Sequence, residues 1–182
     1  SMGDIDLAIS AVTDISDAVT GTTAPSAAVR AVYPTQTLTG TAAETGSYTL
    51  PLPARLAVDT KVTVSANRYF LTKSLSTVVT GSVSVTHLTD LEFYGFAVPY
   101  HRSIVKRIDP DWYIEVTDTR KGGGDWYLYA SLKLPLQSEN RQLDNVLTFY
   151  ENGIKQILSD TPVLIKHGVS ASVPAVTRVS WT

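Results

Sequence analysis

The fold is decided by residues 126–134, which read Trp-Tyr-Leu-Tyr-Ala-Ser-Leu-Lys-Leu. Apolar side chains occupy every second position, from Trp126 through Leu132 to Leu134, and the positions between them begin with Tyr127 and Tyr129. Successive side chains of a β-strand point to opposite faces, so a period of two is typical of a strand with one buried side. The stretch therefore predicts a half-buried β-strand.

The same alternation recurs along the rest of the chain. In residues 61–66 the apolar Val62, Val64 and Ala66 alternate with polar side chains. Threonine occurs 23 times and valine 20 times, and both are β-branched residues that favour strands. The chain is therefore predicted to be all-β. Residues 9–19 are interpreted as strand plus connection. Further strands are predicted at 29–33, 47–52, 112–117 and 146–150. Asn152-Gly153 predicts a hairpin turn.

The domain organisation follows from length and from a change in composition. The chain has 182 residues, which suits one large domain or two small ones. Residues 4–80 are rich in threonine and alanine and lack tryptophan, whereas residues 81–182 hold all three tryptophans and all three histidines. We predict two unlike β-sandwich domains in tandem over these two ranges, and we interpret Ser1-Met2-Gly3 as a cloning remnant.

Charge and composition exclude several classes of protein. The formal net charge is −2, and residues 1–80 and 81–182 each carry one acidic side chain more than basic ones. A nucleic-acid-binding protein needs a basic surface, so this class is disfavoured. Hydrophobic content of 43% excludes disorder, and no apolar run reaches the ~18 residues of a membrane helix. Cysteine is absent, which excludes disulfides and thiolate sites.

Three segments of the first half carry a recognisable order of turns and strands. They read Ala-Val-Thr-Gly-Thr-Thr-Ala-Pro-Ser-Ala-Ala-Val at 18–29, Gly-Ser-Tyr-Thr-Leu-Pro-Leu-Pro at 46–53 and Leu-Ala-Val-Asp-Thr-Lys-Val-Thr-Val at 56–64. This skeleton resembles the bacterial immunoglobulin-like module of surface proteins. Asp59 stands where that family commonly has glycine. The resemblance implies a module that spaces or presents another part of the protein.

The second half carries a different set of ordered motifs. Residues 88–95 read Leu-Thr-Asp-Leu-Glu-Phe-Tyr-Gly, residues 114–120 read Ile-Glu-Val-Thr-Asp-Thr-Arg, and residues 122–130 read Gly-Gly-Gly-Asp-Trp-Tyr-Leu-Tyr-Ala. Together with Leu-Gln-Ser at 136–138 and Leu-Asp-Asn-Val at 143–146, this order is similar to the WxL domain of low-GC Gram-positive bacteria.

The WxL resemblance has one complete motif and two departures. Trp126-Tyr127-Leu128 fills the first W-x-L, and Trp181 looks like the start of the second, which lacks its leucine here. Tyr94 interrupts the usual Phe-Gly pair. WxL domains attach exported proteins non-covalently to the cell wall, with peptidoglycan as the proposed ligand. The resemblance therefore implies an extracellular, wall-associated protein whose export signal lies outside these residues.

Aromatic side chains on two predicted strands form a candidate sugar-binding site. Aromatic rings can stack on the C–H faces of sugars, and Tyr113, Tyr127 and Tyr129 are predicted to stand side by side if residues 112–117 and 126–134 form a hairpin. Trp126 and Leu128 belong to the same motif, although their alternation also fits plain packing in the core.

The loop between these strands has a structural interpretation. Asp118 is predicted to cap backbone N–H groups and to pair with Arg120, and both are kept as candidate binding residues. Gly122-Gly123-Gly124 is predicted to be a hairpin tip, because it lacks the lysine and the helix of a phosphate-binding loop. An isopeptide bond from Lys106 to Asn145 or Asn152 stays open.

No catalytic motif was found. His87, His101 and His167 lie far apart in sequence, and there is no G-x-S-x-G motif, so no enzyme activity, cofactor or metal is predicted. The sequence favours a fragment of an exported Gram-positive surface protein that binds peptidoglycan or another wall polymer. The alternatives are an adhesin module that binds a host or partner protein, and a carbohydrate-binding accessory domain of a secreted enzyme.

The end of the chain generates a stability prediction. Val179 and Trp181 alternate in a predicted strand and share one face, which we expect to be the core. Trp181→Ala should therefore destabilise the second domain by about 3–5 kcal/mol and leave the melting of the first domain unchanged. Calorimetry checks this, and two unshifted transitions would show that this end is a frayed tail.

Overall fold

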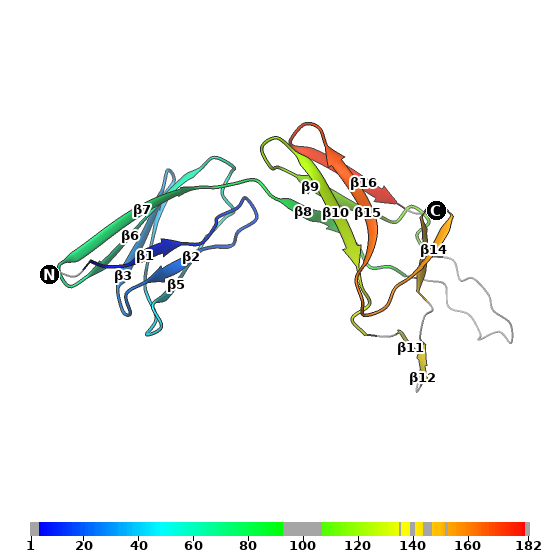
Figure 1. The fold of residues 1–182 in the computed structure, drawn as a ribbon, viewed down its shortest axis with the longest axis horizontal. Helices are drawn as coiled ribbons and strands as arrows, with labels where there is room; N and C mark the ends of the chain where they lie inside the picture. Colours follow the sequence, from blue (N-terminus) through cyan, green and yellow to red (C-terminus); the bar gives the residue numbers. More distant parts are fainter. Residues whose placement is uncertain are drawn as a thin grey trace. The chain divides into compact units, whose positions relative to one another are not determined.

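The computed structural model describes residues 4–92, 107–134, 136–138, 141–143, 147–151 and 153–180. These residues form strands, turns and irregular segments without any α-helix, which confirms the all-β prediction (Figure 1). No helix long and apolar enough to cross a membrane occurs among them. The chain divides into two compact units, Ser1–Ser82 with Thr119–Lys121, and Val83–Asp118 with Gly122–Thr182.

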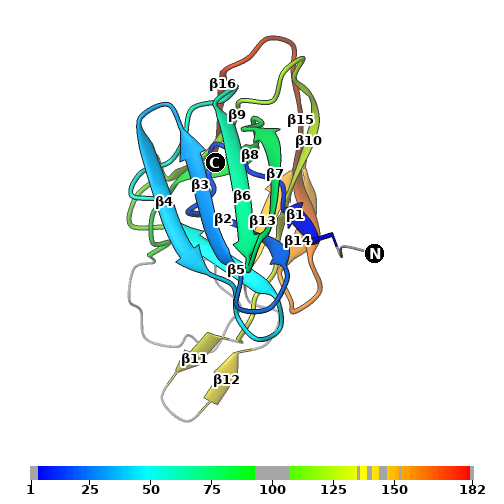
Figure 2. The same cartoon turned by 90° about the vertical axis from the view of Figure 1, so that its left-hand side faces the viewer.

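The first unit contains two antiparallel sheets. Figure 2 shows the strands of the larger sheet side by side, in the order β4-β3-β6-β7. The smaller sheet has the order β1-β2-β5. Residues 10–17 connect β1 to β2 without a helix, so the prediction of strand plus connection is confirmed. The strands are β1 (Leu7–Ile9), β2 (Ala18–Thr23), β3 (Ala28–Tyr33), β4 (Gln36–Thr41), β5 (Ser47–Pro51), β6 (Lys61–Arg68) and β7 (Leu71–Val78).

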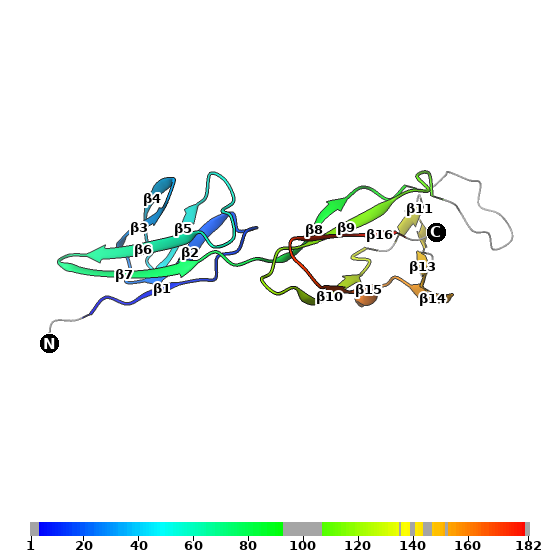
Figure 3. The ribbon, with the colours of Figure 1, turned by 90° about the horizontal axis from the view of Figure 1, so that it is seen from above.

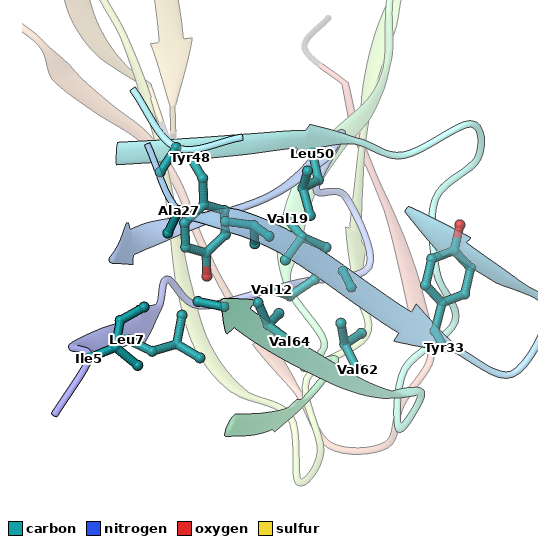
Figure 4. Packing of buried hydrophobic residues seen from close by; sticks show 14 of the residues in the cluster. Ile5, Leu7, Val12, Val19, Ala27, Tyr33, Tyr48, Leu50, Val62 and Val64 are labelled. Carbon is teal, nitrogen blue, oxygen red and sulfur yellow. The ribbon is translucent and has the colours of Figure 1, made fainter. Parts of the chain in front are cut away.

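The two sheets of the first unit share one apolar core. Val62, Val64 and Ala66 of β6 are fully buried, as their alternation predicts. Val19 of β2 and Leu50 of β5 join them from the other sheet (Figure 4). Burial of apolar side chains is the main favourable term in folding, so this shared core holds the two sheets together.

Tyr48 ties the smaller sheet together. Its hydroxyl donates a hydrogen bond of 2.8 Å to the backbone oxygen of Ala8, across the intervening strand β2. Gly21 of β2 makes this possible, because a β-carbon there would overlap both the Ala8 oxygen and the Tyr48 hydroxyl. Burial raises the pKa of Tyr48 from 10.0 to about 12, since the phenolate would lose its hydration.

The second unit also has two main sheets, which Figure 3 shows as two layers. One has the order β16-β9-β8 and the other pairs β10 with β15. Val116, Trp126 and Val179 are buried together, with Val83 and Leu128 packed against them. The strands are β8 (Val83–Leu88), β9 (Tyr113–Asp118), β10 (Gly124–Ala130), β11 (Leu136–Ser138), β12 (Arg141–Leu143), β13 (Thr148–Glu151), β14 (Ile154–Ile157), β15 (Val163–Ser170) and β16 (Ala175–Ser180).

Strand β10 is shorter than predicted. It ends at Ala130, which pairs with Val163, and Leu134 is 77% exposed instead of facing the core. The next register position on the partner is Pro162, which has no N–H to donate to the ladder. The hairpin prediction at Asn152-Gly153 is confirmed, since Glu151 of β13 pairs with Ile154 of β14 and Gly153 has a φ of 77°.

Tyr48 gives the first unit a predicted pH dependence. Below pH 10 the phenol is protonated in both the folded and unfolded states, so it adds no pH dependence there. Between pH 10 and about 12 the unfolded state loses this proton first, so stability should fall as pH rises. Tyr48→Phe should cost about 1 kcal/mol at pH 7 by removing the hydrogen bond.

Urea melts at pH 8 and pH 11 measure both effects. Tyr33→Phe, which alters the other buried tyrosine of this core, is the matched control. If the free energy of unfolding falls by the same amount from pH 8 to pH 11 in the wild type and in Tyr48→Phe, Tyr48 is not the source of the pH dependence.

Candidate functional site

The first W-x-L motif lies in the core of the second unit. Trp126 is only 5% exposed, and its indole lies against Gly168, its register partner on β15. A β-carbon at Gly168 would overlap the indole ring, so the glycine provides the space that the tryptophan fills. Leu128 is half-buried against the same cluster. The alternation of β10 therefore turns the residues between them outward.

Tyr127 and Tyr129 stand on the opposite face of β10, exposed by 54% and 57%. Tyr127 pairs in register with His167 of β15, and their rings are stacked at 4.5 Å between centroids with 6° between planes. This contact orders the Tyr127 ring on the surface. The structure thus presents a pair of exposed aromatic rings on one side of the β10–β15 sheet.

His167 is itself held by a carboxylate. Its Nε2 lies 2.7 Å from Asp125 Oδ1. The two side chains are therefore hydrogen-bonded to each other on the surface. We call the surface formed by Asp125, Tyr127, Tyr129 and His167 the β10–β15 outer face. It combines aromatic surface with solvent-facing groups that can donate or accept hydrogen bonds.

Tyr113 does not belong to this face, which corrects the predicted hairpin. Strand β9 pairs with β8 and β16, whereas β10 pairs with β15 in the other sheet. The side chain of Tyr113 stacks on His87 at 4.3 Å, and the Arg178 guanidinium lies 3.6 Å from its ring centroid. His87 and Arg178 come from strands on opposite sides of β9, and both contact the Tyr113 ring. The role of Tyr113 in binding stays a prediction.

The glycine run explains why the hairpin does not form. Gly122, Gly123 and Gly124 all have positive φ, of 84°, 62° and 113°. Non-glycine residues rarely adopt this conformation, and three in succession redirect the chain from one sheet to the other. Gly123 also packs against the backbone oxygen of Ser170, where a β-carbon would not fit. The run is a crossover between sheets, not a hairpin tip.

Asp118 and Arg120, two other predicted site residues, lie outside strands β10 and β15. Asp118 is 1% exposed at the end of β9, where its register partners are Val83 and Ala175. Arg120 is half-buried in the β9–β10 connection, and its pairing with Asp118 stays a prediction. Trp181 lies outside the described residues, as do His101, Lys106, Asn145 and Asn152.

The β10–β15 outer face can stack apolar surfaces on its tyrosine rings and form hydrogen bonds at His167 and Asp125. Within the described ranges no group of three histidine, cysteine, aspartate or glutamate side chains converges as a metal site would require. The alternation along the sequence predicted that Tyr127 and Tyr129 face outward, but not that His167 and Asp125 are their neighbours. The contact between His167 and Tyr127 depends on a pairing between strands 40 residues apart, for which no local motif exists.

The space beside Gly168 that the Trp126 indole fills leads to a stability prediction. Gly168→Ala places a methyl group inside the volume of the Trp126 indole, so the second unit should lose about 1–3 kcal/mol. Gly153→Ala is a control for the addition of a methyl group, because nothing lies within 4 Å of a β-carbon there, although its φ of +77° adds backbone strain. Near-ultraviolet circular dichroism of the tryptophans during thermal unfolding measures the difference. If Gly168→Ala is more stable than the wild type, the Trp126 indole does not fill the space beside Gly168.

Comparison with known proteins assigns no family to the chain. No protein-family model matches it, and no curated protein matches its sequence.

Proposed function

We propose that the chain is a non-catalytic part of an exported Gram-positive cell-surface protein. In this proposal the first unit is an immunoglobulin-like spacer, and the second is a WxL-like domain that attaches non-covalently to peptidoglycan or another wall polymer. The observation that carries it is the β10–β15 outer face, where Tyr127 and Tyr129 are exposed beside the hydrogen-bonded His167 and Asp125.

The chemistry of this face suits a sugar polymer. Sugar rings present C–H surfaces that pack on aromatic rings, while their hydroxyl groups need hydrogen-bonding partners. Tyr127 and Tyr129 offer the first, and the exposed parts of His167 and Asp125 offer the second.

One turn of the first unit supports the proposal that this unit is an immunoglobulin-like spacer. The N–H of Thr60 bonds to the backbone oxygen of Ala57, and Asp59 inside this turn has a φ of 70°. Glycine is the residue that best tolerates this conformation, which agrees with the glycine that the immunoglobulin-like family commonly has at this position.

Adhesion to a partner protein is the second candidate, and one turn favours it. Tyr69 and Phe70 connect β6 to β7 and are both strongly exposed, and Tyr69 has a φ of 57° that is unfavourable for an aromatic residue. Exposed aromatic side chains are common anchors of protein interfaces. Binding to a partner that is lost in Phe70→Ser but kept in Tyr127→Ala would favour adhesion over wall attachment.

Binding to purified Gram-positive peptidoglycan tests the proposed function. The wild-type chain should be retained, and the double variant Tyr127→Ala/Tyr129→Ala should bind at least tenfold more weakly, since stacking on a ring contributes about 1 kcal/mol or more. Tyr150→Ala removes an exposed tyrosine of the same unit outside this face and is the matched control.

Two results would contradict the proposal. They are absence of wild-type retention, and equal retention of the wild type and the double variant. Preference for soluble plant or host sugars over wall polymer would favour a carbohydrate-binding accessory domain instead.

A further inference from the structure

Strand β4 forms one edge of the four-stranded sheet of the first unit (Figure 2). It pairs with β3 over six consecutive residues without a register shift. Among the described strands, none pairs with its second side. Thr37, Thr39 and Thr41 are exposed along it, and β4 contains neither a charged residue nor a proline. A regular, uncharged edge is a template on which another strand can pair.

The ladder between β3 and β4 shows which backbone groups face the free side. The N–H of Ala42, at the next position of this ladder, donates a hydrogen bond of 2.9 Å to the backbone oxygen of Ala27. Bonded and non-bonded pairs alternate in an antiparallel ladder, so the even-numbered residues of β4 bond to β3. The N–H and C=O groups of Thr37, Thr39 and Thr41 therefore point to the free side. Within the described part of the chain, no backbone group is hydrogen-bonded to them there.

Two other edges of the described sheets carry features that hinder pairing. Lys73 of β7, at the opposite edge of the same sheet, pairs with the buried Ala66 and so points toward the inner face. The ladder of β8 shifts register between Val85 and His87. Inward-pointing charges and bulges keep an edge strand from adding a partner. Strand β4 has neither feature.

The sequence of β4 matches itself in the antiparallel direction. A two-fold axis at Thr39 would place Thr39 opposite its own copy and Thr37 opposite Thr41 of the second copy. These are the three residues whose backbone groups face the free side, so about six hydrogen bonds can form between the two strands. Their side chains would lie opposite one another on the outer face, where pairs of threonines are favourable.

The inner face of β4 fits the same pairing. With the axis at Thr39, Leu38 of one copy lies beside Gly40 of the other. A β-carbon at Gly40 would lie 2.6 Å from Leu50 Cδ2, so Leu50 covers the inner side at this position. Leu38 is half-buried against the same core, and it would lose further exposed surface beside the glycine. A large side chain thus lies next to the residue that leaves it the most room.

We propose that the first unit binds a second copy of itself by antiparallel pairing of β4 with β4 about a two-fold axis at Thr39. The match of β4 with itself favours a second copy over an unrelated strand. This goes beyond the proposed function and does not depend on it, because no residue of the β10–β15 outer face takes part. One strand pair is smaller than the ~1,200–2,000 Å² of stable interfaces, so we expect a weak dimer.

Sedimentation velocity of the full chain over a concentration series tests the dimer. The wild type should shift from monomer to dimer between about 10 μM and 1 mM. Thr37→Lys/Thr41→Lys places lysine opposite lysine across the axis and should weaken the dimer about tenfold. Thr37→Lys/Thr41→Glu places lysine opposite glutamate and should dimerise like the wild type. Thr72→Lys, on the opposite edge strand of the same sheet, is the matched control.

Amide hydrogen exchange locates the interface on the strand. The N–H groups of Thr37, Thr39 and Thr41 should exchange rapidly in dilute solution and more slowly as the chain concentration rises. The N–H of Gly40, which bonds to β3, should exchange slowly at every concentration and is the internal control.

The outcomes decide both the partner and the register. A wild type that is still monomeric at about 1 mM overturns the proposal and leaves the edge to an extended segment of another protein. A dimer that both double variants retain uses a different surface. A dimer that both double variants lose does not have its axis at Thr39. Circular dichroism melts of the three variants confirm that they are folded.

Discussion

The contact between the Trp126 indole and Gly168 determines how strand β10 presents its side chains. The indole occupies the space where a β-carbon of residue 168 would lie, so it can only face the core. Because side chains alternate along a strand, Tyr127 and Tyr129 must then face solvent. Shifting β10 by one residue would bury both tyrosines and expose the tryptophan. The packing of the Trp126 indole thus determines which side chains of β10 face solvent.

That constraint also determines which neighbours Tyr127 has. Tyr127 stands on the outer face, where His167 stacks on it and Asp125 holds His167. Strand β10, which carries Tyr127, pairs with β15 alone among the described strands.

Local patterns in the sequence predicted several strands and their buried faces, although β4, β7, β8 and β15 were not among them. The alternation in β6 placed Val62 and Val64 in the core, and the alternation in β10 turned Tyr127 away from it. Pairing between distant strands could not be predicted in the same way. Tyr113 was expected beside Tyr127, but the positive φ angles of the glycine run send β10 into the other sheet.

The parts of the candidate site that sequence reasoning missed depend on long-range register. His167 reaches Tyr127 only because β15 pairs with β10. The end of β10 likewise depends on Pro162, a residue of the partner strand. Periodicity describes one strand at a time, so it carries no information on such neighbours.

Chemical-shift mapping of the isotope-labelled chain with soluble peptidoglycan fragments tests the central claim most directly. The claim is that a wall polymer binds across the β10–β15 outer face. We expect the largest shifts at the amides of Tyr127 and Tyr129 and at the His167 ring, with residues 4–80 unchanged. Shifts confined to residues 4–80, or none in the second unit at millimolar fragment, would contradict it.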